Sequence, residues 1–155
     1  MNILSLFDGM SCGQIALDRL GIKVDNYFAS EIDKYAIQVT QANFPNTKQI
    51  GSVVDGFSFA GKQLNFEDPR SKLFFEFVRL IEECKPKYFL LENVKMKKEC
   101  QEVITKYLGV EPIEINSNLV SAQSRKRLYW TNIPDVQQPE QVDYNVNELI
   151  EGEGF

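Results

Sequence analysis

The stretch Leu6-Phe7-Asp8-Gly9-Met10-Ser11-Cys12-Gly13 decides the fold of this chain. It closes an apolar run over residues 3–7 that is typical of a short buried strand. It precedes residues 14–20, whose apolar side chains have helical spacing and which Gly21 ends. Strand, glycine turn and helix in this order receive a nucleotide-like ligand in open α/β sheets, because glycines allow close backbone approach and the helix start offers free N–H groups. A plain tight turn is the competing interpretation.

Strand-like and helix-like segments alternate along the rest of the chain. We expect further strands over 24–30, 48–54, 88–91, 110–115 and 127–133. We expect helices over 33–42, 71–84 and 99–108, and a loop over 56–68. This alternation predicts an α/β fold with a Rossmann-like, doubly wound, mostly parallel sheet that helices cover on both faces. Residues 1–134 are expected to form the core, and 135–155 a polar acidic tail.

Composition limits the possible chemistry. The 155 residues are 43% hydrophobic, which suits one domain with a real core. The sequence has no histidine, which excludes Ser-His-Asp and Cys-His catalysis, and its three cysteines form no disulfide or metal-binding pattern. A net charge of −5 argues against strong binding of nucleic acid by the chain alone. The chain starts directly with an apolar strand and has no run long enough to cross a bilayer, so we expect a cytoplasmic location.

Three further groups of polar residues border predicted strands. Glu31 ends the second strand, where it could accept hydrogen bonds from ribose hydroxyls. Leu90-Leu91-Glu92-Asn93-Val94 places a carboxylate at the carboxyl end of a buried strand, facing the crevice of the sheet. Gln123-Ser124-Arg125-Lys126-Arg127 places two arginines on one face, and paired guanidinium groups suit carboxylate or phosphate. The alternatives are a surface acid, a strand-end cap and a solvated basic edge.

Taken together, these stretches resemble the DNA cytosine-C5 methyltransferases over about residues 2–134. The family begins with Phe-x-Gly-x-(Gly/Ser)-x-Gly, and the matching residues are Phe7, Gly9, Ser11 and Gly13. Residues 56–62, Gly-Phe-Ser-Phe-Ala-Gly-Lys, resemble a later family stretch. Residues 92–94 match its Glu-Asn-Val, and Gln123, Arg125 and Arg127 match its Gln-x-Arg-x-Arg. Five motifs, with the acid at Glu31, occur in the family's order.

The resemblance implies transfer of a methyl group from S-adenosylmethionine to C5 of cytosine in DNA. The expected site for this cofactor, or for its product S-adenosylhomocysteine, consists of Phe7, Asp8, Gly9, Met10, Ser11, Cys12, Gly13, Glu31, Ile32 and Val53. The expected catalytic residues are Glu92, Asn93, Arg125 and Arg127, and no metal is expected. DNA is the expected partner, bound weakly by this chain alone.

The resemblance also exposes an interruption. In the family, Pro-Cys-Gln precedes the Gly-Phe-Ser stretch, and its thiolate attacks C6 of a flipped cytosine. Here Gly56 follows Ser52-Val53-Val54-Asp55, and the chain contains no Pro-Cys-Gln. About twenty residues, a strand and its loop, have no counterpart. Strands 3–7 and 88–91 are then expected either to pair directly or to leave a slot. The family's target-recognition region and last cofactor-pocket motif are also expected to be absent from this chain.

Three interpretations follow from this interruption. The chain is an enzyme or one part of a split enzyme, or a non-catalytic relative, either a degenerate remnant or a regulatory partner, or a longer polypeptide with a segment that this sequence omits. The mass of the intact polypeptide would reveal the third. Cys12, Cys84 and Cys100 are not expected to replace the nucleophile, because free cysteines are usually small buried hydrophobic residues. We therefore expect weak cofactor binding and no DNA methylation by the chain alone.

Overall fold

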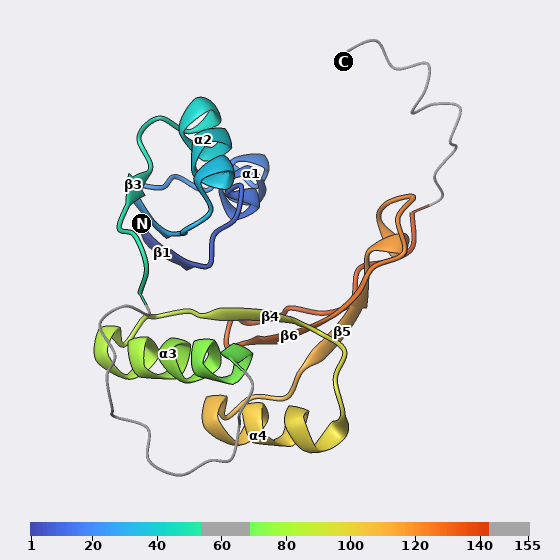
Figure 1. Cartoon of the computed structure of the whole chain (residues 1–155). Helices are drawn as coiled ribbons and strands as arrows, with labels where there is room; N and C mark the ends of the chain where they lie inside the picture. Colours follow the sequence, from blue (N-terminus) through green and yellow to red (C-terminus); the bar gives the residue numbers. More distant parts are fainter. Residues whose placement is uncertain (54–68, 143–155) are drawn as a thin grey trace. The chain divides into compact units, whose positions relative to one another are not determined.

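The computed structural model of the chain describes residues 1–53 and 69–142. The chain divides into two compact units, Met1–Arg79 and Leu80–Phe155 (Figure 1). The expected loop over 56–68 and the later part of the expected tail lie outside the described residues. The division into a core over 1–134 and a tail over 135–155 stays a prediction.

The first unit contains a parallel three-stranded sheet in the order β1-β2-β3. Its elements are β1 (Asn2–Leu6), α1 (Cys12–Arg19), β2 (Asn26–Ser30), α2 (Lys34–Asn43) and β3 (Lys48–Gln49). Tyr27 and Ala29 alternate along β2 and are buried, at 5% and 0% exposure. In Figure 1, α1 and α2 lie next to each other on one side of this sheet.

Asp33 begins α2 in the way that its residue type predicts. Its carboxylate accepts hydrogen bonds from the backbone N–H groups of Tyr35 (2.8 Å) and Ala36 (2.9 Å). These bonds satisfy two of the donors that every helix leaves free at its start. The predicted helix start is therefore confirmed.

The second unit contains an antiparallel three-stranded sheet in the order β4-β6-β5. Helix α3 (Pro69–Cys84) runs into this unit from the first. The remaining elements are β4 (Leu90–Val94), α4 (Lys98–Leu108), β5 (Ile113–Asn116), a 3-10 turn η1 (Ser117–Leu119) and β6 (Lys126–Thr131). The connection over 117–125 is shorter than the dozen or so residues that a parallel crossover needs, so β6 returns antiparallel to β5.

Helix α4 covers one face of the second sheet. Trp130 is fully buried, and its indole N–H donates to the Thr105 hydroxyl of α4 at 3.1 Å. Leu128 and Ile104 are also buried, at 3% and 6% exposure. The small core of this unit therefore lies between β6 and α4.

The predicted alternation of strands and helices is confirmed, but several boundaries were wrong. The strand predicted over 48–54 covers only Lys48–Gln49, and Phe7 has left β1 with a left-handed φ of 57°. Glu92 lies inside β4 rather than at its end, because pairing with β6 continues to Val94. Arg125 precedes β6. In the described parts of the chain, no helix has the length and apolar character needed to cross a membrane.

Strand β1 lies at one edge of the first sheet, and β4 lies at one edge of the second sheet. The expectation that these two strands either pair directly or leave a slot for a third stays a prediction.

Candidate functional site

The turn after β1 has an alternating left-handed backbone. Phe7, Gly9 and Ser11 have φ values of 57°, 60° and 59°. The N–H of Asp8 donates to the carbonyl of Ser30 at 3.1 Å, so the turn is fixed to the carboxyl end of β2. A Cβ atom added at Gly9 would meet no atom within 4 Å. Glycine at this position therefore provides the left-handed conformation and leaves open space on the side where a ligand could approach.

A network of hydrogen bonds from buried hydroxyl groups fixes this turn. The Asp8 carboxylate accepts hydrogen bonds from the Tyr27 hydroxyl (2.8 Å) and from the Ser11 hydroxyl. The Thr40 hydroxyl lies 3.2 Å from the Ser11 hydroxyl and 3.4 Å from the Gly9 carbonyl, and its single proton can be donated to either. Ser11 and Thr40 are both 0% exposed. The turn is thus tied to β2 through Tyr27 and to α2 through Thr40.

Tyr27 keeps its proton well into alkaline solution. Burial raises the pKa of its hydroxyl far above the ordinary value, a hydrogen bond with Ser5 opposes this, and Asp8 raises it further. The neutral hydroxyl can therefore donate to Asp8 over the whole physiological range. Gly13 leaves room for it, because a Cβ at Gly13 would lie 3.0 Å from the Tyr27 oxygen.

Glu31 connects the end of β2 to the turn. One carboxylate oxygen accepts from the N–H of Gly9 (2.8 Å), and the other accepts from the N–H groups of Ile32 (2.7 Å) and Asp33 (2.8 Å). Partial burial acts to raise the pKa of Glu31, but the bonds from Asp33, Gly9 and Ile32 outweigh it and hold the pKa below its ordinary value. The ionised carboxylate has room for another hydrogen bond, on the oxygen that Gly9 contacts.

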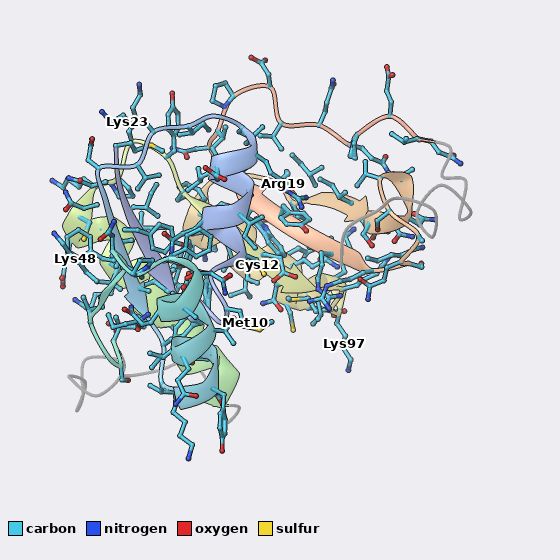
Figure 2. The ribbon with its side chains drawn as sticks, turned by 90° about the horizontal axis from the view of Figure 1, so that it is seen from above. Met10, Cys12, Arg19, Lys23, Lys48 and Lys97 are labelled. Atoms are coloured by element: carbon cyan, nitrogen blue, oxygen red, sulfur yellow. The ribbon has the colours of Figure 1, made fainter. Side chains whose placement is uncertain are left out.

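Apolar side chains are exposed beside the turn. Ile32 is 78% exposed and Met10 is 55% exposed. Met10 and Cys12, labelled in Figure 2, line a hollow of about 230 Å³ together with Ile15, Val39, Asn43 and Phe44. Pockets that bury a whole small molecule are usually about 300–1,000 Å³, so this hollow would take only part of one.

Cys12 and Cys84 are exposed, and Cys100 is half-buried. The expectation of small buried cysteines was therefore wrong for the first two. Cys12 is exposed because it begins α1, which has no buried residue. Val53, the last predicted cofactor residue, is half-buried in a bend after β3.

A carboxylate and a guanidinium meet on one face of the second sheet. Arg127 Nε lies 2.6 Å from Glu92 Oε1. Glu92 is paired with Tyr129 in the ladder and Arg127 with Val94, so Glu92, Arg127 and Tyr129 share a face. Burial raises the pKa of Tyr129, the charge of Glu92 raises it further, and Arg127 and Arg125 oppose this.

The other two predicted catalytic residues lie apart from this pair. Asn93 alternates to the opposite face, and its side-chain oxygen accepts from the N–H of Val94 at 2.8 Å. The backbone of Arg125 is bonded to the side chain of Asn116 (2.8 Å) and to the N–H of Ser117 (3.1 Å). The structure therefore brings Glu92 and Arg127 together and gives Arg125 only a longer-range charge effect on the same face.

Sequence reasoning missed Tyr27, Thr40 and Tyr129. Tyr27 and Tyr129 lie in predicted strands, but only the ladder register shows which polar groups they face. Within residues 1–53 and 69–142, no group of three or more Cys, Asp or Glu side chains could hold a metal ion.

A glycine turn after the first parallel strand, with an acid after the second, is the arrangement of Rossmann-like proteins that bind nucleotide-like ligands. The sequence profile of the C-5 cytosine-specific DNA methylases matches residues 1–55 and 55–148. The chain therefore belongs to this family, whose methyl donor is S-adenosylmethionine.

Relatives and solved structures agree with this assignment. The chain is 35% identical to the type II methyltransferase M1.ScrFI of Lactococcus lactis subsp. cremoris over 82% of its own length and 40% of that protein's. It is 34% identical to the orphan methyltransferase M.Rho11sI of Bacillus phage rho11s, over 61% of its length and 23% of that protein's. The S. pombe Dnmt2 methyltransferase superimposes on all of it with a TM-score of 0.63 at 20% identity, covering 56% of that chain. This likeness confirms the predicted fold class, and the chain spans well under two thirds of each protein.

The comparisons also support the predicted interruption. The two matches to the family profile meet at Asp55. The alignment with the phage protein extends over 116 residues, yet 61% of the 155-residue chain is only about 95 residues. The alignment with the Lactococcus protein extends over 156 residues, whereas 82% of the chain is about 127. The relatives therefore carry about 20 to 30 additional positions within the matched stretch.

Proposed function

We propose that this chain is the cofactor-binding core of a DNA cytosine-C5 methyltransferase, and that it does not methylate DNA by itself. The observation that carries the first part is the bond between the Glu31 carboxylate and the N–H of Gly9. This bond places an ionised acid directly beside the open space of a left-handed glycine turn. An acid in that place suits a ribose-containing ligand.

The residues of the first unit fit S-adenosylmethionine, which supplies the methyl group when bound. The free acceptor position on Glu31 suits a ribose hydroxyl, and the exposed side chains of Ile32 and Met10 suit an adenine ring. The turn from Phe7 to Gly13 leaves its backbone close to the ligand. Binding is expected to be weak, because the additional positions of the relatives are predicted to border the same pocket.

The pair of Glu92 and Arg127 supports a role at the target base. Arg127 fixes one oxygen of the Glu92 carboxyl group and leaves the other available for a ring nitrogen. Acid–base assistance of this kind is worth about 10²–10⁴-fold. It does not make C5 of cytosine nucleophilic, because that requires addition of a nucleophile at C6. Without a Pro-Cys-Gln loop the chain has no residue in that role.

Calorimetry with the full chain tests the cofactor assignment. Wild type is expected to bind S-adenosylhomocysteine, and Glu31→Gln to bind it roughly tenfold or more weakly, because a hydrogen bond to a charged group contributes about 1.5–3 kcal/mol. Glu140→Gln makes the same charge change at an exposed position and is expected to bind like wild type. No binding by wild type at millimolar ligand would reject the cofactor site, and equal binding by Glu31→Gln would reject the ribose assignment.

Transfer of labelled methyl to mixed-sequence duplex DNA tests the second part. Purified chain of verified mass is expected to show no incorporation. Incorporation that survives simultaneous Ser replacement of Cys12, Cys84 and Cys100 would contradict the proposed mechanism. Incorporation lost with one replacement would identify that cysteine as the nucleophile.

A split enzyme is the second candidate function, and a non-catalytic regulatory protein the third. The split enzyme is favoured by an interruption confined to one point, Asp55, between otherwise continuous family matches. Methylation that appears only when a second polypeptide supplies a Pro-Cys-Gln loop would support it. Cofactor binding with no restored activity would support the regulatory protein.

A further inference from the structure

Strand β1 lies at an edge of the first sheet but does not have the sequence of an edge strand. The sheet order β1-β2-β3 leaves β1 and β3 at its two edges. β3 has two residues, one of them Lys48, and shortness and charge are the usual protections of an edge. β1 has five residues, Asn-Ile-Leu-Ser-Leu, with neither charge nor proline. Only the β3 edge is therefore protected against further pairing.

The side chains of β1 match an interior position. Parallel strands inside a sheet are typically continuous apolar runs, because both faces are covered. Leu4 is 41% exposed here, opposite Phe28 of β2, and Ile3 and Leu6 are half-buried. A run of this composition is suited to a partner strand on each side.

The size of the interruption indicates the occupant. The relatives carry about 20 to 30 positions that this chain lacks within the matched stretch, and the family profile match is divided at Asp55. A strand of about 5–6 residues with connections of about 4–6 residues on each side accounts for most of that length. The missing segment is therefore long enough to form one more strand of the sheet.

We infer that the outer edge of β1, which pairs with no other strand of the described sheet, is the docking site for one parallel strand supplied by a second polypeptide, which carries the segment that this chain lacks. The strand adds to the sheet by backbone hydrogen bonds. A parallel direction is required, because the loop after the added strand then emerges at the carboxyl ends, where the turn from Asp8 to Gly13 lies. The identity of the partner rests on the proposed function, whereas the position of β1 at the edge of its sheet does not.

A labelled peptide tests the docking. Its sequence is the segment of the Lactococcus relative that aligns opposite the junction at Asp55, and its binding to the full chain is measured by fluorescence anisotropy. Two further peptides carry N-methyl groups at alternate residues, in the two possible registers, and a fourth is scrambled. The unmodified peptide is expected to bind, with affinity falling at least tenfold for the scrambled peptide and for one methylated register. Binding that neither methylated register weakens would overturn strand addition.

Variants locate the site. Leu4→Lys adds a charge to the β1 edge at a position already exposed, and is expected to weaken peptide binding at least tenfold. Ile50→Lys makes the same change at a position 45% exposed beyond β3, and is expected to leave it unchanged. Equal binding by wild type and a folded Leu4→Lys chain would overturn the proposal, as would no binding by wild type at millimolar peptide.

Cofactor binding separates the two proposals. Peptide binding in a chain that does not bind S-adenosylhomocysteine would reject the proposed function and leave the docking edge in place. Cofactor binding without peptide binding would reject the docking edge and leave the proposed function in place. Sedimentation tests whether a second copy of this chain occupies the edge. A wild-type dimer that Leu4→Lys dissociates, but that the peptide does not dissociate, would identify a second copy as the occupant. That result would contradict the inference.

Discussion

Replacing Tyr27 with Phe should loosen the turn without disturbing the packing around it. The change removes one oxygen atom and keeps a ring that is 5% exposed. The Asp8 carboxylate loses the donor at 2.8 Å, while the Ser11 hydroxyl still donates to its other oxygen. The bond between Tyr27 and Ser5 is lost as well, so the perturbation consists of the two hydrogen bonds of one hydroxyl group.

The magnitude follows from the charge of the acceptor and its burial. Hydrogen bonds to charged groups contribute about 1.5–3 kcal/mol when their loss leaves the partner unsatisfied. Asp8 is half-buried, so water can replace part of the lost bond. We expect the free energy of unfolding to fall by about 1–2 kcal/mol, at the lower end of this range. Affinity for S-adenosylhomocysteine should fall several-fold, because the turn is then less well ordered before binding.

Urea unfolding followed by circular dichroism at pH 8 measures the first effect, and calorimetry the second. Tyr88→Phe is the control, because Tyr88 is 43% exposed and its hydroxyl has no hydrogen bond among the described residues. The raised pKa of Tyr27 adds a second signature. Its contribution is present below the unfolded value of about 10 and is lost as pH rises above that value, so wild type should lose stability there more steeply than Tyr27→Phe.

Equal stability of Tyr27→Phe and Tyr88→Phe would refute this reasoning. So would an unchanged dependence of stability on pH above about 10, because the buried hydroxyl would then carry no differential charge effect.

Further changes test other contacts of the two units. Asp33→Ala should lower the free energy of unfolding by about 1 kcal/mol through loss of the α2 cap, measured by urea unfolding. Glu31 has a lowered folded pKa, so its contribution is present above the unfolded value of about 4.3 and is lost as pH falls through the folded pKa; Glu31→Gln should flatten the stability profile below about pH 5. Thr105→Val should cost about 1 kcal/mol by leaving the buried Trp130 N–H without its acceptor, and a shifted Trp fluorescence would accompany it.

Local signals predicted the parts of the structure that depend on neighbours in sequence. The glycine turn is an example, since a turn between the first strand and the first helix follows from residue types within a few positions, although the helix begins at Cys12, two residues before the predicted start. The cap at Asp33 is another, because its carboxylate reaches N–H groups two and three residues ahead. The resemblance to the family then gave the place of the interruption, which the profile match also puts at Asp55.

Contacts between distant segments were not predictable in the same way. Thr40 lies 31 residues from Gly9, and nothing in the sequence around it distinguishes it from a surface threonine of an amphipathic helix. The predicted end of β4 was wrong for a related reason, since its length depends on pairing with β6, more than thirty residues later. The antiparallel direction of β6 depends on the short connection that precedes it. The apolar pattern of a strand does not indicate its direction, so this feature was not predicted.

The pair of Glu92 and Arg127 limits what a docked strand could restore. At 44% and 18% exposure this is a partly solvated ion pair, and such pairs contribute only about 0–1 kcal/mol to stability. The pair also neutralises Arg127, which leaves Arg125 and Lys126 as the basic charges of this stretch in a chain of net charge −5. Phosphate neutralisation dominates affinity for DNA, so we expect this stretch to contribute little of it. A short peptide could supply a nucleophile at the β1 edge but not a basic surface. Peptide binding without methylation is therefore the expected result, and recovery of methylation would require a larger partner that supplies both.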